Sequence, residues 1–176
     1  MKIFKNIQKL QKNILDNKSI SFVPTMGGLH KGHISIIKKA KNAEEKTLVS
    51  IFINPKQFNK KKDYLKYPRN FDKDLSKLRS LKVDYVFIPN KKEIFSFKPK
   101  NEIYLDNFSK KLCGLNRKGH FRGVVNIVNR FLEIIKPKKI FLGKKDYQQI
   151  YLINKHILKR KIKTRVVKCA KIREKN

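Results

Sequence analysis

The sequence is poor in the residues that cross-link small domains or anchor a chain in a membrane. Its two cysteines, Cys113 and Cys169, lie far apart and show no CxxC spacing, so neither a disulfide framework nor a zinc knuckle is indicated. Tryptophan is absent, and no apolar run approaches the length of a membrane span. The N-terminal stretch also lacks the unbroken apolar segment of a secretory signal. We therefore expect a cytoplasmic protein without a membrane partner.

Acidic residues are scarce too, with 13 Asp and Glu against 45 Lys and Arg and a formal charge of +32. Such a charge is typical of proteins that bind nucleic acid or another polyanion. Only eight of the basic residues are arginine, however, and the lysines are spread along the whole chain. Nucleic-acid readers usually concentrate charge on one face and use arginine for paired contacts. We expect a solvated basic surface and no specific nucleic-acid partner; a non-enzymatic basic binding module is the alternative.

What the chain does have is enough apolar sequence for one domain, since 40% of its 176 residues are hydrophobic. Apolar runs and period-two stretches predict strands, and spacings of three and four predict helices. The expected strands are 19–23 (ended by Pro24), 47–53, 83–88, 139–142 and 164–169, with a shorter one at 102–105. The expected helices are 4–16, 34–40, 72–81, 123–135 and 146–160. This alternation predicts an α/β fold, with a Rossmann-like open, mostly parallel sheet and helices on both faces.

Ligands of such sheets bind beyond the carboxyl ends of the strands. Three segments follow expected strands there, namely residues 24–33, 54–58 and 143–146. We expect these segments to meet at one edge of the sheet, although they are distant in sequence.

Residues 24–33 read PTMGGLHKGH, which is neither a P-loop nor a GxGxxG turn because the glycine spacing differs. The glycines allow close backbone approach, and the following helix offers the N–H groups and dipole that favour phosphate. His30 and His33, three residues apart, can both face one ligand. A plain strand-to-helix turn with surface histidines, or half of a metal site lacking a third ligand, are the alternatives.

Other polar residues near the expected edge carry weaker signals. Lys145 and Asp146 open a helix and could simply be a solvated cap. Gln57 and Gln149 could each hold a hydroxyl or carboxylate, or merely be exposed. Asp74 lies in the first turn of a helix, where an acid is favourable without any further role.

Taken together, six segments resemble the pantothenate synthetase family. They are FVPTMGGLHKGH, SIFINPKQF, YPRNFDKDL, GHFRGVV, FLGKKDYQQ and the terminal KIRE, in the family's order and approximate spacing. The chain also resembles the wider HxGH nucleotidylyltransferase superfamily through His30-Lys31-Gly32-His33. The resemblance implies that the fold is of this superfamily's type.

The resemblance implies a ligase that joins (R)-pantoate and β-alanine in a reaction driven by ATP with Mg²⁺, through a pantoyl adenylate, in a homodimer. Implied catalytic residues are His33, His30 and Lys145. Implied ATP contacts are Met26, Gly27, Gly28, Leu29, His30, Lys31, Gly32, His33, Gly143, Lys144, Lys145, Asp146 and Ile172. Implied pantoate or β-alanine contacts are Gln57, Gln149, Asn54 and Tyr67. Asp74 matches a family pocket position too, and as an acid that begins a helix it is our expected metal ligand.

Two departures from the family pattern bear on activity. The family's GEKD reads GKKD here, so Lys144 stands where the family has an acid. The family also continues with DGLA and SSRN motifs and a smaller C-terminal lid domain, which the 176 residues do not contain. We expect residues 1–176 to form the nucleotide- and pantoate-binding domain. The alternatives are a weakly active or inactive ATP-binding remnant and a nucleotidylyltransferase with another substrate.

Overall fold

The computed structural model describes residues 1–15, 19–43 and 45–170. Its strands are β1 (Lys2–Phe4), β2 (Ile20–Thr25), β3 (Lys46–Ile51), β4 (Tyr85–Phe87), β5 (Lys139–Gly143) and β6 (Arg165–Cys169). The α-helices are α1 (Ile7–Ile14), α2 (Lys31–Lys41), α3 (Lys61–Lys66), α4 (Phe71–Ser80), α5 (Lys91–Ile94), α6 (Cys113–Asn116), α7 (His120–Ile135) and α8 (Tyr147–Lys159). Three short 3₁₀ helices are η1 (Pro55–Gln57), η2 (Asn107–Lys110) and η3 (Lys144–Asp146).

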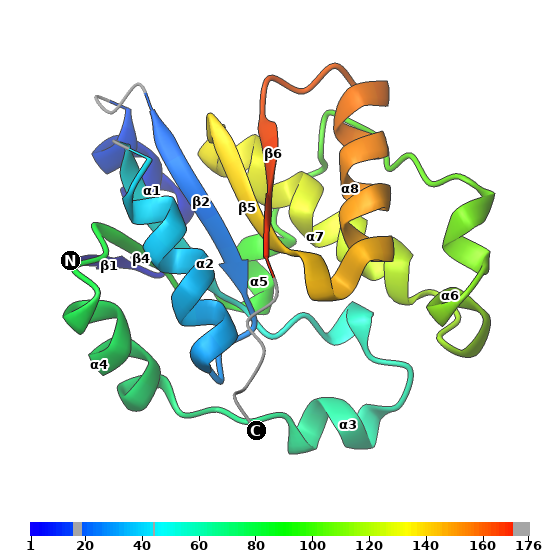
Figure 1. Ribbon diagram of the computed structural model, residues 1–176, viewed down its shortest axis with the longest axis horizontal. Coiled ribbons are helices and arrows are strands. Elements are labelled where there is room, and N and C mark those ends of the chain that lie inside the picture. Colours follow the sequence, from blue (N-terminus) through cyan, green and yellow to red (C-terminus); the bar gives the residue numbers. More distant parts are fainter. Residues whose placement is uncertain (16–18, 44, 171–176) are drawn as a thin grey trace.

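The six strands form one parallel sheet in the order β1-β4-β3-β2-β5-β6. From β2 the chain builds outward to β3 and β4, and then returns to add β5 and β6 on the other side (Figure 1). The direction of building therefore reverses between β2 and β5, and such a reversal leaves a crevice at the carboxyl ends of the two strands. The predicted open parallel sheet is confirmed.

Helices cover both faces of the sheet, as the near-continuous apolar strands require. Side chains alternate between the faces along each strand, so Phe22 joins one core and Val23 the other. The larger core packs the sheet against α1, α7 and α8, and the smaller core packs it against α2 and α4. No helix among the described residues is long and apolar enough to cross a bilayer.

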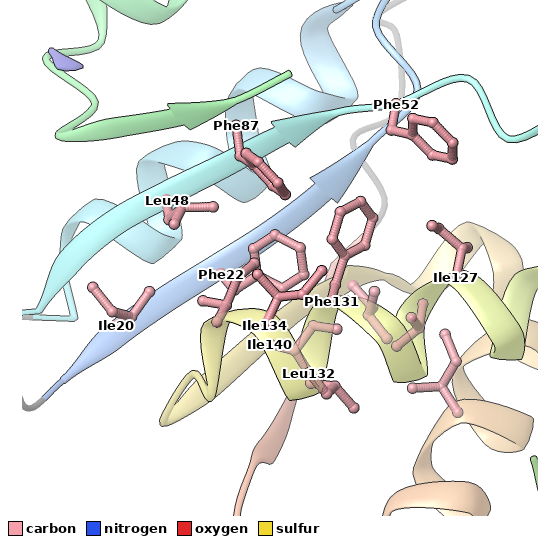
Figure 2. Close-up of a cluster of buried hydrophobic side chains, with 14 of the residues drawn as sticks. Ile20, Phe22, Leu48, Phe52, Phe87, Ile127, Phe131, Leu132, Ile134 and Ile140 are labelled. Carbon is pink, nitrogen blue, oxygen red and sulfur yellow. The ribbon is translucent and has the colours of Figure 1, made fainter. Parts of the chain in front are cut away.

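Phe131 of α7 lies at the centre of the larger core (Figure 2). Its ring centroid is 5.5 Å from that of Phe22, 6.4 Å from that of Phe52 and 6.2 Å from that of Phe87, all in edge-to-face arrangements. These contacts fix α7 across the middle strands. They matter for the site because Phe52 and Phe131 also form part of its wall.

Two expectations about strands were wrong. β2 does not end before Pro24 but continues to Thr25, with Pro24 opposite Ser50 of β3. The Thr25 carbonyl accepts the Phe52 N–H on the β3 side, so the preceding Pro24 faces β5, and pairing with β5 stops at Phe22. Its missing N–H therefore leaves no ladder bond unmade.

The segment 102–105 is not a strand. The Tyr104 N–H instead donates to Nδ1 of His156, at 3.1 Å. The edge strand β1 was not predicted. It pairs with β4 and includes Phe4, which we expected to begin the first helix.

Candidate nucleotide site at the carboxyl edge of the sheet

A cavity of about 870 Å³ opens beyond the carboxyl ends of β2, β3 and β5. All three segments expected to meet at this edge contribute to its wall, which confirms that they converge. The sequence-predicted residues that line it are Met26, Leu29, His30, Lys31, Gly32, His33, Gln57, Tyr67, Gly143, Lys144, Lys145, Asp146 and Gln149. A volume of this size is in the range of small-molecule sites.

The glycine turn after β2 adopts left-handed backbone conformations, with φ of +81° at Gly27 and +63° at Gly28. These angles are costly for residues with a Cβ, which explains the glycine pair. The N–H groups of Gly28 and Leu29 both donate to the Asp74 carboxylate, each at 2.8 Å. Gly27 and Gly28 are not among the described residues of the cavity wall. Their expected contact with ATP stays a prediction, and the structure shows them turning the chain toward His30.

His30 and His33 cap the N-terminus of α2, and their rings are in contact at a tilt of 43°, with centroids 4.1 Å apart. Nδ1 of His30 accepts the Gly32 N–H at 3.1 Å, and Nδ1 of His33 accepts the His30 N–H at 3.4 Å. A Cβ on Gly32 would lie 2.9 Å from Cε1 of His30, so glycine is needed there for the ring to fit. Each imidazole is thus held by its Nδ1, which leaves Nε2 as the atom free to meet a ligand.

The pKa of His33 is lowered to about 4. Burial is the largest cause, followed by the neighbouring His30, while Lys77 and Lys145 act in the same direction and Asp74 opposes them. At neutral pH the ring is therefore uncharged, and because Nδ1 accepts a hydrogen bond, the proton sits on Nε2. His33 presents a neutral N–H donor at the cavity wall.

Positive side chains surround the same wall. Lys144 and Lys145 come from η3, directly after β5, and Lys31 begins α2. Lys77 of α4 also lines the cavity, and its Nζ donates to the Leu29 carbonyl. The sequence analysis missed Lys77 because one lysine among so many on a helix gives no signal. Together with the helix N-terminus, these cations suit a polyanionic ligand such as a phosphate chain.

The two predicted glutamines both line the cavity and come from different elements, Gln57 from η1 and Gln149 from α8. The adjacent Gln148 is different, because it is buried and its side chain binds Cys113 N, Phe108 O and Lys111 O. The structure thus separates a structural glutamine from one that faces the cavity. The repeat of identical residues hid this difference in the sequence.

The cavity also has an apolar wall that the sequence analysis did not assign to a site. It consists of Phe52, Val124, Ile127, Val128 and Phe131. Residues 123–135 gave only a helical pattern in the sequence, since an apolar face that lines a ligand cavity has the same period as one that packs in a core. The wall offers space for aliphatic groups next to polar side chains.

Tyr67 and Asn54, the other two expected substrate contacts, lie differently. Tyr67 lines the cavity, packs edge-on against Phe58 at 5.6 Å, and has its pKa raised by burial. Asn54 is fully buried and is not among the described residues of the wall. Its Nδ2 donates to the Gly123 carbonyl at 3.1 Å and its Oδ1 accepts the Lys56 N–H. Asn54 therefore positions η1 by linking it to α7.

The contact between η1 and α7 is unusually close. A Cβ on Gly123 would lie 2.1 Å from the Lys56 carbonyl oxygen, so only glycine fits. One turn earlier, Nδ1 of His120 lies 2.7 Å from the Gln57 carbonyl oxygen and donates to it. Gly123 and His120 belong to the GHFRGVV segment, whose sequence alone indicates no function for either residue. The structure shows that both fix the backbone of Gln57.

Two further predictions concern the metal ligand Asp74 and the adenine contact Ile172. Asp74 is 3% exposed and both its oxygens accept backbone N–H groups, so it anchors the turn. Its expected role as a metal ligand stays a prediction. No group of three or more His, Cys, Asp or Glu side chains gathers within the described residues. Ile172 lies outside the described residues, as does the terminal KIRE motif.

Comparison with known proteins places this geometry in context. The family model described as pantoate-beta-alanine ligase matches residues 2–176. The pantothenate synthetase of Pseudothermotoga lettingae is 40% identical over 177 residues, which is 99% of this chain and 63% of that protein. The enzyme of the same name from Francisella philomiragia is 42% identical over 181 residues, with 99% of this chain and 68% of that protein covered.

Solved structures agree with the sequence relatives. Pantothenate synthetase from Thermus thermophilus superposes with a TM-score of 0.92 at 29% identity, covering 99% of this chain and 63% of that chain. The pantoate-beta-alanine ligase of Francisella tularensis, complexed with beta-gamma ATP and beta-alanine, gives 0.92 at 40% identity, with 99% and 68% covered. The chain thus spans between 63% and 68% of the length of these relatives.

Proposed function

The chain belongs to the pantoate–β-alanine ligase family, and from that premise we propose that it carries the adenylating site of an ATP-dependent ligase joining (R)-pantoate to β-alanine. The observation that carries the proposal is the cavity itself. It brings the His30–His33 cap, the lysines of η3, two glutamines and an apolar wall to one place at the switch point of the sheet. A nucleotide and a small branched hydroxy acid need these groups side by side.

In the first step the pantoate carboxylate attacks the α-phosphorus of ATP, forming the acyl–phosphate bond and releasing pyrophosphate. The negative charge that grows on the departing phosphates needs donors already in place. We assign this task to the neutral Nε2–H of His33 and to the ammonium of Lys145, with His30 holding the α2 N-terminus in its capped form. The protein's contribution is alignment and charge stabilisation.

In the second step the β-alanine amine attacks the acyl carbon of the adenylate, forming the amide and releasing AMP. Activation is required because a carboxylate is a poor acyl donor at neutral pH. The Francisella tularensis relative was solved with beta-gamma ATP and beta-alanine, which supports the same pair of ligands here. The product of the proposed reaction is pantothenate.

The walls of the cavity match pantoate, which has two methyl groups flanked by hydroxyls and a carboxylate. Phe52, Val124 and Val128 provide the apolar surface for the methyl groups. Gln57 and Gln149 provide amides that can bind hydroxyl and carboxylate oxygens. A nucleotidylyltransferase for another acid is the second reading, and replacing the glutamines discriminates between the two.

We propose that Mg²⁺ enters with ATP. Mg²⁺ keeps most of its ligands as water and phosphate oxygens, so a single protein carboxylate is sufficient. Asp146 fits this role because it is exposed and lines the cavity beside Lys145, whereas Asp74 is 3% exposed and is not among the described residues of the cavity wall. The metal would shield the phosphate charge from the attacking carboxylate.

Pantoate-dependent exchange of labelled pyrophosphate into ATP tests the proposal. We expect exchange that requires pantoate and falls by at least about a hundredfold in His33→Ala. The matched control is Lys38→Ala, on the exposed side of the same helix, and it should exchange like the unmodified chain. Absence of exchange from folded protein would refute the adenylating activity and leave the ATP-binding remnant. Binding that weakens steeply with salt would instead favour a basic binding module.

We also propose a homodimer and a cytoplasmic location, both supported only by the family and the proposed metabolic reaction. Light scattering during size-exclusion chromatography tests the first, and a mass of 20.9 kDa, that of one chain, would contradict it.

A further inference from the structure

We propose that Asp74 and Lys77 form a clamp on the glycine turn, and that Lys77 is thereby a positioning residue for the nucleotide. The turn is the segment 26–29 between β2 and the His30 cap. The clamp itself rests on contacts alone, while its effect on nucleotide binding rests on the proposed function.

The two residues lie three positions apart on α4, which places them on one face of that helix. Oδ2 of Asp74 accepts the Gly28 N–H and Oδ1 accepts the Leu29 N–H, each at 2.8 Å. Nζ of Lys77 donates to the Leu29 carbonyl. One helix face therefore holds three backbone groups of two consecutive residues, including both polar groups of Leu29.

The turn requires such support because it is neither strand nor helix. After its left-handed glycines, the successive N–H groups of Gly28 and Leu29 meet one carboxylate, and buried backbone groups without partners are costly. Asp74 is 3% exposed and Leu29 2% exposed, so water is a poor substitute for the clamp. His30 follows Leu29 directly, and the position of the capped helix therefore depends on how firmly Leu29 is held.

Lys77 adds charge as well as support. It lines the cavity, and none of the ion pairs among the described residues includes it. Its ammonium has three N–H donors, one of which is directed to the neutral Leu29 carbonyl. The positive charge is therefore not neutralised by a contacting carboxylate and acts on an anion in the cavity. Asp74 has the complementary role in the clamp, because it accepts backbone N–H groups whereas Lys77 donates to a carbonyl.

The first test measures ATP affinity by calorimetry on the full chain, with ATP alone as the probe. Lys77→Met should weaken binding by about tenfold or more, the effect of losing one charge-assisted contact, and Lys77→Arg should restore most of it. Lys73→Met is the matched control, because Lys73 is exposed on the same helix and outside the cavity wall. Unchanged affinity in Lys77→Met, or an equal loss in Lys73→Met, would overturn the role in nucleotide binding.

The second test does not depend on ATP. Amide hydrogen exchange of Gly28 and Leu29 should be at least about tenfold faster in Asp74→Asn, whose Nδ2 cannot accept a hydrogen bond. The Leu48 amide in β3 should exchange at the original rate and show that the fold is intact. Unchanged exchange at the turn would overturn the clamp. If the unmodified chain does not bind ATP, the proposed function fails, and this exchange experiment still decides whether the clamp exists.

Discussion

His156 makes buried hydrogen bonds, and we expect their contribution to the free energy of unfolding to be lost in acid. The ring is fully buried, its Nδ1 accepts the Tyr104 N–H, and its Nε2 lies 3.0 Å from the Asn129 side-chain oxygen. Burial, assisted by Arg160 and opposed by Glu133, lowers its pKa to about 4. The neutral ring therefore fits both neighbours, and protonation would remove the acceptor that Tyr104 uses.

The sign and size of the effect follow from the two pKa values. The folded-state pKa lies below the unfolded value of about 6.5, so the unfolded chain binds the proton first as the pH falls. The stabilisation is complete above pH 6.5 and is lost between pH 6.5 and 4. For this single group, the free energy of unfolding should fall by about 2 kcal/mol between pH 7 and pH 5.

Urea denaturation at pH 7, 6 and 5 measures this loss when the unmodified chain is compared with His156→Gln. Glutamine can accept the Tyr104 N–H and donate to Asn129 but does not titrate in this range. The variant should lose about 1 kcal/mol at pH 7 and show a decline toward pH 5 that is smaller by about 2 kcal/mol. An identical decline in the two proteins would refute the reasoning, because other groups would then account for it.

Four further substitutions test three separate features. Lys161 follows α8 with φ of +53°, so Lys161→Gly should raise the free energy of unfolding by about 0.5–1 kcal/mol in urea titrations; a decrease would contradict the conformational argument. Gln149→Ala should raise the KM for pantoate with little change in melting temperature, whereas Gln148→Ala should lower the melting temperature, since a buried side chain with three hydrogen bonds is lost; the reverse pattern would exchange their roles. Gly123→Ala should displace η1, since its Cβ would meet the Lys56 carbonyl, and should reduce pyrophosphate exchange at least about tenfold; unchanged exchange would mean that Gln57 does not depend on this contact.

The sheet could be predicted because its signals are local. Strands buried on both faces are apolar without interruption, and the alternation with helices limits the topology to a few arrangements. The boundary at Pro24 could not be predicted, since it depends on where the pairing of β2 with β5 stops. The prediction of a strand at 102–105 was wrong because this segment also depends on a distant contact. The Tyr104 N–H donates to His156, 52 residues away in the sequence.

Site residues that belong to a recognisable motif could be predicted from the sequence. Residues whose role depends on tertiary contacts could not. The His30–His33 cap and the glutamines were named from the sequence, and they do line the cavity. Asp74 has the residue type of a metal ligand, yet its partners are backbone N–H groups of a turn 45 and 46 residues away. Lys77 is one of many lysines, and only its contact with Leu29 distinguishes it.

The proposed function requires this cavity to activate a carboxylate as its adenylate. The most direct measurement uses pantoate labelled with ¹⁸O in the carboxylate, together with ATP, Mg²⁺ and β-alanine, and determines the mass of the nucleotide product. Attack on the α-phosphorus predicts AMP that carries one ¹⁸O atom, because the bridging oxygen leaves with AMP when the amide forms. Unlabelled AMP, or ADP with labelled phosphate, would contradict the account.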